Sequence, residues 1–171
     1  MITGEDFWAF SLSVYRQPGV PEECLALQGS LGADVNLLLL CAYLGAKQKA
    51  LLDKDDIEAL AAASLAWHVD IVRSLRAARQ ALKPWEEGRD QKLQDSARVL
   101  RSAVKKLELD AERIEHDLLA NWASGRTFRL SSPDIAVDAN VSALIDHYRR
   151  GLDAAPMPVH LIAAAVALAA R

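Results

Sequence analysis

The sequence is poor in the residues that favour β-strands. Of 171 residues only two are threonine, and aromatic residues make up 6%. Strands are enriched in β-branched and aromatic side chains, so this composition argues against a sheet. The two cysteines, Cys24 and Cys41, have no Cys-x-x-Cys spacing. We expect two reduced thiols in the core of a cytoplasmic protein, rather than a disulfide or a reactive thiol.

Long apolar runs are also missing. The N-terminal segment MITGEDFWAF carries acidic residues where a signal peptide carries positive charge. The most apolar run covers residues 159–170 and is shorter than the ~20 residues that cross a bilayer. We therefore expect no membrane span. The run is interpreted as a buried helix or as a helix docked on a partner.

Motifs of the common enzyme classes are not found. There is no Gly-x-Ser-x-Gly elbow, no glycine-rich phosphate loop and no zinc-type cysteine pairing. Glu112, Glu115 and His116 share a helical stretch, but their spacing differs from the Glu-x-x-His of di-metal bundles. We predict no catalytic residue, no metal site and no cofactor, which argues against an enzyme.

The residues that are abundant favour helix. The chain contains 30 alanines and 26 leucines, both good helix formers. Its net charge of −3 excludes a molecule that binds nucleic acid through its whole surface. The prediction is an all-α, single-domain bundle of about seven helices around a long antiparallel hairpin.

Capping and breaking residues place the first helices. Thr3 and Asp6 resemble an N-cap pair, and Pro18–Pro21 interrupts the chain before a second helix that Gly32 closes. Asp34 starts a third helix that is apolar nearly all round from Leu37 to Leu44. Such a helix belongs at the centre of a bundle, and its sequence favours helix beyond Gly45.

Two long helices form the predicted hairpin, at about residues 54–123. The first ends before Pro84, and the second runs from about residue 91 to 123. A turn this short implies antiparallel packing. The second helix has apolar residues in alternating three- and four-residue steps, which predicts its contact seam: Leu93, Ala97, Leu100, Val104, Leu107, Ala111, Ile114 and Leu118. Further helices are expected at about residues 134–171, the first of them from about residue 138 to Gly151.

Charge is sorted along this hairpin. Residues 73–106 near the turn contain ten basic and four acidic residues, whereas residues 53–58 and 108–117 contain nine acidic and two basic ones. The candidate anion- or partner-binding residues are Arg76, Arg79, Lys83, Arg98 and Arg101. The candidate acidic partner surface is Glu108, Glu112 and Glu115. These basic and acidic residues have three possible interpretations: solvated ion pairs, surfaces that bind a second copy or another protein, or an anion site.

A second candidate site is a pocket around His68. This histidine shares a helix face with apolar residues beside Trp67, and Asn36 starts the central helix. A core histidine bonded to a polar group is the simpler interpretation. A ligand contact or proton transfer is the alternative.

Three stretches, DVNLLLLCAYLG, LRAARQALK and LELDAERIE, together with FWAFSLSVY, resemble a proteobacterial family of short helical proteins. The family is a domain of unknown function, and the resemblance covers about residues 5–120. It implies a bacterial, cytosolic, all-α protein and supplies no catalytic residues.

Three functions are open at this point. The first is a non-enzymatic interaction protein that self-associates or docks a protein partner through the hairpin. The second is a bundle that binds a small or anionic ligand near His68. The third is nucleic-acid binding through the basic end of the hairpin, which the near-neutral net charge weakens.

Overall fold

Side chains that cap helix ends set the first boundaries. The Thr3 hydroxyl accepts the Asp6 N–H at the start of α1 (Gly4–Tyr15), and Asp34 accepts the Asn36 N–H at the start of α3 (Val35–Gln48). Between them, α2 (Val20–Leu31) ends at Gly32, whose φ of 65° is a left-handed conformation that favours glycine. These predicted boundaries are confirmed.

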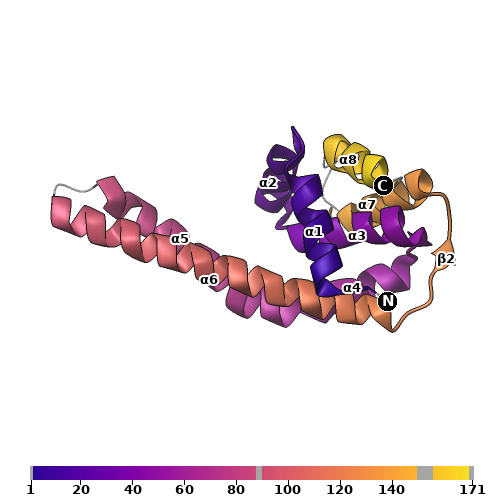
Figure 1. Cartoon of the computed structure of the whole chain (residues 1–171), viewed down its shortest axis with the longest axis horizontal. Helices are drawn as coiled ribbons and strands as arrows, with labels where there is room; N and C mark the ends of the chain where they lie inside the picture. Colours follow the sequence, from indigo (N-terminus) through magenta and orange to yellow (C-terminus); the bar gives the residue numbers. More distant parts are fainter. Residues whose placement is uncertain (1, 88–89, 150–155, 170–171) are drawn as a thin grey trace. The chain divides into compact units, whose positions relative to one another are not determined.

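The computed structural model describes residues 2–87, 90–149 and 156–169, and its regular structure is helical apart from one pair of two-residue strands (Figure 1). The elements after α3 are β1 (Ala50–Leu51), α4 (Lys54–Trp67), the π-helical turn η1 (His68–Val72), α5 (Arg73–Leu82), the 3₁₀ turn η2 (Lys83–Glu87), α6 (Gln91–Ser124), β2 (Arg129–Leu130), α7 (Pro133–Arg149) and α8 (Val159–Ala169). This confirms the all-α fold.

Three details differ from the prediction. The helix expected over residues 53–83 is interrupted by η1, and α7 begins at Pro133, earlier than the expected residue 138. The third helix does continue past Gly45, but it ends at Gln48 because Lys49 adopts a positive φ of 55°. The predicted helix end at Gly151 and two residues of the predicted turn, 88 and 89, lie outside the described residues.

The chain divides into two compact units, which we describe separately. The first consists of residues 1–63 and 116–171, and the second of residues 64–115. The first unit contains the core, and the second contains most of the predicted hairpin.

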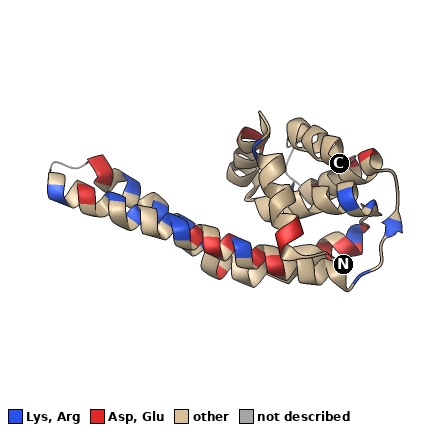
Figure 2. Ribbon diagram, in the orientation of Figure 1, with Lys and Arg blue, Asp and Glu red and all other residues tan. Residues whose placement is uncertain are grey.

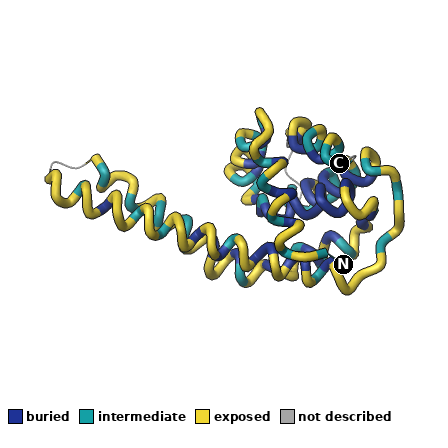
Figure 3. Tube along the Cα trace, in the orientation of Figure 1, coloured by how far each residue is buried: buried dark blue, intermediate teal, exposed yellow. Residues whose placement is uncertain are grey.

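Helix α3 is the centre of the first unit. Every residue from Asn36 to Ala46 is buried, and α3 packs against α1, α7 and α8. The tube in Figure 3 is accordingly dark along α3. A helix that is apolar on all sides gains most when it is surrounded, so the sequence-based placement of this helix is confirmed.

Polar contacts hold the outer elements to this core. The fully buried Asn140 of α7 accepts the Leu52 N–H through Oδ1 at 2.8 Å, and its Nδ2 donates to the carbonyls of Cys41 and Ala50. One side chain therefore joins α7, α3 and β1. Strand β1 pairs antiparallel with β2, with Ala50 opposite Leu130.

The start of α8 is held by a carboxylate of α2. Both oxygens of Glu23 accept the backbone N–H of His160, and one also accepts that of Leu161, at 3.0 Å. Glu23 Oε1 lies 2.7 Å from the ring Nδ1 of His160. A negative group at a helix N-terminus satisfies unpaired donors and is favoured by the helix dipole.

Among the described residues, no helix combines the length and the apolar character needed to cross a bilayer.

Candidate functional site

The second unit is a helical hairpin, a name used from here on for residues 64–115. Its inner contacts run in opposite directions along the two arms. Trp67 donates its indole N–H to the Ala111 carbonyl, Arg79 binds Glu108, and Arg101 binds Glu86 nearer the turn. Along the first arm, residues 67, 79 and 86 therefore contact residues 111, 108 and 101 of α6. The second series falls as the first rises, so the two arms are antiparallel, as predicted (Figure 1).

Ion pairs occupy the space between the two arms. Arg76 Nε lies 2.9 Å from Glu108 Oε1, and Arg76 Nη2 lies 2.8 Å from Glu112 Oε1. Arg79 donates to both oxygens of Glu108, and Arg101 Nη1 lies 3.3 Å from Glu86 Oε1. Side-chain exposures of 8% for Glu108 and 17% for Arg76 show that these groups are largely removed from water. Such pairs need their partners, since a lone buried charge is unfavourable.

The ion pairs change how the carboxylates titrate. Burial by itself raises the pKa of Glu108, but the hydrogen bonds from Arg79 and Arg76 outweigh it, and the pKa is lowered. For Glu112 burial prevails over the Arg76 charge, and the pKa is raised. The hydrogen bond to Glu108 raises the pKa of Arg79. The pKa values of Glu108 and Glu112, which lie one turn apart on α6, are therefore shifted in opposite directions.

The candidate charged residues differ in their partners and in their burial. Arg76, Arg79 and Arg101 hold carboxylates of the same hairpin, and Arg98 binds Asp95 at 3.0 Å on its own helix. Lys83 is exposed near the turn. Of the candidate acidic surface, Glu108 and Glu115 are buried and Glu112 is half-buried. Figure 2 shows Lys and Arg on α5 and the first half of α6, and more Asp and Glu further along α6.

The residues of the candidate pocket belong to both units. Asn36 lies in the first unit, at the capped start of α3. His68 and Trp67 lie in the hairpin, where the buried His68 places Nδ1 3.2 Å from Oε1 of the fully buried Glu115. His68 opens the π-helical turn η1, and such turns are frequent at functional sites. The bonds to Glu115 and to the Ala111 carbonyl fit a histidine and a tryptophan that stabilise the hairpin.

The predicted contact seam of α6 is only half right. Ala97 and Ala111 are buried between the arms, whereas the leucines of the seam are not. One row of it, spaced by seven residues, is about half exposed: Leu93 at 48%, Leu100 at 53%, Leu107 at 55% and Ile114 at 46%. Two helices share only one inner face, and here arginine–glutamate pairs and alanines fill it. The leucines are left on the outside.

The first arm carries a matching apolar row. Its steps of four and three residues continue from η1 through α5 into η2: Ile71, Leu75, Ala78, Leu82 and Trp85. Ile71 is 38% and Trp85 57% exposed, and Leu75 and Leu82 are half-buried.

Both rows lie on the same side of the hairpin. Leu100 follows the inner Ala97 by three residues, and Leu75 follows the inner Val72 by three, so each row is rotated by about 60° from its inner face in the same sense. Two antiparallel helices are related by a two-fold axis perpendicular to the plane that contains them both. This axis leaves the two sides of that plane unchanged, so rows rotated equally from the two inner faces lie on the same side. The hairpin therefore has an apolar side formed by both arms. Arg98 and Glu112 of α6 are rotated from the inner face in the opposite sense and lie toward the other side.

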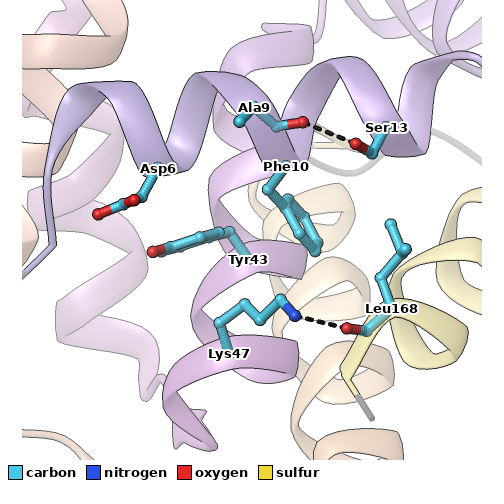
Figure 4. A pocket seen from close by; sticks show the side chains of 7 residues that line it. All are labelled: Asp6, Ala9, Phe10, Ser13, Tyr43, Lys47 and Leu168. Carbon is cyan, nitrogen blue, oxygen red and sulfur yellow. Dashed lines mark hydrogen bonds between the residues drawn. The ribbon is translucent and has the colours of Figure 1, made fainter. Parts of the chain in front are cut away.

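The first unit has a pocket of its own. A hollow of about 370 Å³ lies between α1, α3 and α8 (Figure 4), lined by Asp6, Ala9, Phe10, Ser13, Tyr43, Lys47 and Leu168. Lys47 Nζ donates to the Leu168 carbonyl in the last turn of α8 at 2.6 Å, and Asp6 accepts the Thr3 hydroxyl at the start of α1. Burial, helped by the Asp6 charge, raises the pKa of Tyr43. The charged groups of this hollow thus hold helix ends.

Comparison with known proteins decides the family. A family model described as a protein of unknown function, DUF2390, matches residues 6–119. The chain belongs to this family. The match begins and ends within a residue of the predicted resemblance and includes the whole hairpin. Neither the curated proteins nor the solved structures contain a match to the chain.

The membership confirms the predicted resemblance to a domain of unknown function and brings no functional residues with it. The apolar side of the hairpin corrects the prediction made from the sequence. The seven-residue leucine spacing is visible in the sequence, but it predicts a contact inside the hairpin, whereas the row lies outside.

Proposed function

We propose that this protein is a non-enzymatic interaction protein whose hairpin binds a helical protein partner through its apolar side. The observation that carries the proposal is the half-exposed leucine row of α6 beside a partly exposed apolar row on η1, α5 and η2, on the same side of the hairpin. An apolar surface that is exposed among the described residues is characteristic of a protein interface. A leucine repeat of seven residues is characteristic of packing against another helix.

The other two functions have less support. Four of the five candidate cations already hold carboxylates of the hairpin, which leaves fewer charges for a nucleic acid, whose binding depends on many phosphate contacts. His68 and Trp67 have partners within the hairpin.

The proposal includes a location in the cytoplasm of a bacterium. Two buried free thiols suit such a reducing compartment.

Site-specific photo-crosslinking in cells tests the proposal. A photoreactive benzoylphenylalanine replaces Leu107 on the apolar side in one variant. In a matched control it replaces Leu109, which is similarly exposed at 49% but follows the inner Glu108 by one residue and faces away from that side. We expect a discrete covalent adduct, with either a second copy or another protein, from position 107 and none from position 109. No discrete adduct from 107, or equal adducts from both positions, would refute the proposal.

A further inference from the structure

The apolar side is two helices wide, and its width restricts what can cover it. One row lies on α6 and is about half exposed, and the other lies on η1, α5 and η2 and is partly exposed. A single helix placed on this side would fill the groove between the rows but leave their outer flanks in water. A second two-helix hairpin would cover both rows and complete a four-helix bundle, the usual arrangement for antiparallel helices with such spacing.

Resting on the proposed function, we infer that the partner is a second copy of this chain, with the two hairpins stacked antiparallel through their apolar sides. The two-fold axis passes near Leu100. Each Leu100 then meets its counterpart, and Leu93 of one copy lies against Leu107 of the other. The row keeps its seven-residue spacing over three intervals, which lets supercoiled helices stay in register along the contact.

The surface beside Leu100 fits a close contact at that axis. An open and mostly apolar surface runs along the outside of α6, formed by Gln91, Lys92, Asp95, Ser96, Val99, Leu100 and Ala103. Ser96 and Ala103 have small side chains and flank Leu100 on both sides in sequence. Val99, 73% exposed, is among the most exposed large apolar residues of the chain. Small residues beside a large one allow two helices to approach and interlock.

Charge complementarity selects the antiparallel orientation. Lys92 and Asp110 are both exposed at the edge of the apolar side and lie about 27 Å apart along α6, at ~1.5 Å per residue. Their midpoint is residue 101, beside the axis. In the antiparallel pair, Lys92 of each copy lies next to Asp110 of the other, which gives two ion pairs. A symmetric parallel pair would instead stack α6 of each copy on α5 of the other, so that Lys92 and Asp110 of the two copies would not meet.

Sedimentation equilibrium of the full chain tests the inference at the apolar side. The wild type should sediment as a dimer at micromolar concentration. Leu107→Glu should be a monomer, because two buried carboxylates per dimer would have no partner. Leu109→Glu introduces the same charge outside the contact and should remain a dimer. Circular dichroism should show the same helix content in all three, since both leucines are exposed in the single chain.

A charge exchange tests the orientation. Lys92→Glu and Asp110→Lys should each weaken the dimer about three- to tenfold, because each places like charges together at a solvated edge. The double variant restores both ion pairs with reversed polarity and should recover the wild-type dissociation constant. Single variants that associate as tightly as the wild type, or a double variant weaker than both, would overturn the antiparallel arrangement.

The two proposals fail in different ways. A monomeric wild type that still gives an adduct with a different protein from position 107 overturns the second copy as partner and leaves the proposed function standing. A monomeric wild type without any adduct overturns both. A dimer that Leu107→Glu and Leu109→Glu weaken equally also overturns the inference, because association would then not use the apolar side.

Discussion

At the scale of single residues, the core contains two positions, Asn140 and Gly45, where contacts with distant parts of the chain require that residue type. Asn140 supplies one acceptor and two donors to backbone groups of α3, of β1 and of Leu52, which follows β1, while fully buried. Gly45 lies where α3 touches α7, so that a Cβ there would come within 2.6 Å of the Val137 nitrogen. Neither requirement follows from the local sequence.

Replacing Asn140 should strongly destabilise the protein. Asn140→Leu keeps a similar volume but leaves the Leu52 N–H and the Ala50 carbonyl without their bonds in a dry site. We expect the free energy of unfolding to fall by about 3 kcal/mol, since each unsatisfied buried group costs roughly 1–3 kcal/mol. Urea denaturation measures it. Ser142→Ala on the same helix, whose hydroxyl lies 4.0 Å from the Met157 sulfur, should change it by less than about 0.5 kcal/mol. Equal effects would refute the role given to Asn140.

Two glycines should respond to alanine with opposite signs. Gly45→Ala forces α3 away from the backbone of α7 and should cost about 3 kcal/mol, as overpacking of a tight core does. Gly29 lies within α2, and a Cβ there would meet no atom within 4 Å. Gly29→Ala should therefore stabilise the protein by about 0.5–1 kcal/mol through helix propensity. Thermal unfolding of both variants checks this, and a neutral Gly45→Ala would contradict the close packing.

At the scale of elements, the hairpin has its ion pairs inside and the leucine row of α6 outside. Arg76 and Arg79 both bind Glu108, which makes this carboxylate the central acceptor between the arms. The pairing explains why the basic and acidic rows seen in the sequence are close in space. They face each other across the hairpin, in addition to forming contacts along one helix.

Glu108→Gln should remove an acid-sensitive part of the stability. The pKa of Glu108 in the folded protein lies below the ordinary value of 4.5, so its contribution is present above about pH 4.5 and is lost as pH falls through the folded pKa. The variant should be about 2 kcal/mol less stable at pH 7, the size of a charged hydrogen bond. This difference should shrink on acidification below about pH 4.5. Denaturation at a series of pH values measures it.

Glu112→Gln is the matched comparison. The folded pKa of Glu112 is raised, so the charged form is disfavoured at pH 7 and protonation relieves the cost as pH falls through the raised pKa. Relative to its glutamine variant, the wild type should therefore gain stability on acidification from pH 7 to about pH 4.5. Equal pH dependence of the two variants would contradict the opposite pKa shifts.

At the scale of the whole molecule, the two units differ in how their backbones are protected. Helix α3 is buried along most of its length, whereas α5 has no fully buried residue. A segment with few buried contacts opens locally, and a surrounded helix opens only when the protein unfolds. The tube in Figure 3 shows the same contrast between the two helices.

Hydrogen exchange of the wild type and of Leu107→Glu should separate these effects. Amides of α3 should exchange slowest and at the same rate in both proteins. Amides of α5 and of α6 around residues 93–114 should exchange at least about tenfold faster in the variant, because the second hairpin that covers them is lost. Unchanged rates in α5 and α6 would show that nothing covers the apolar side.

The sequence by itself determined the helical class, the boundaries of the first helices, the central position of α3 and the antiparallel hairpin. These follow from local causes: alanine and leucine content, capping residues, and an apolar surface too extensive for a partly exposed helix. The family resemblance was likewise readable from short stretches of sequence, and the match to residues 6–119 confirms it.

The tertiary structure alone decided which side of each hairpin arm faces the other. The three- and four-residue spacing of α6 allows either the leucine row or the row of Ala97, Glu108 and Ala111 to point inward, and periodicity cannot choose between them. The choice depends on arginines of the other arm, 29 to 36 residues away, that bind Glu108 and Glu112. Contacts between residues so distant in the chain leave no local pattern. For that reason the leucine row predicted as an internal seam lies on the outside.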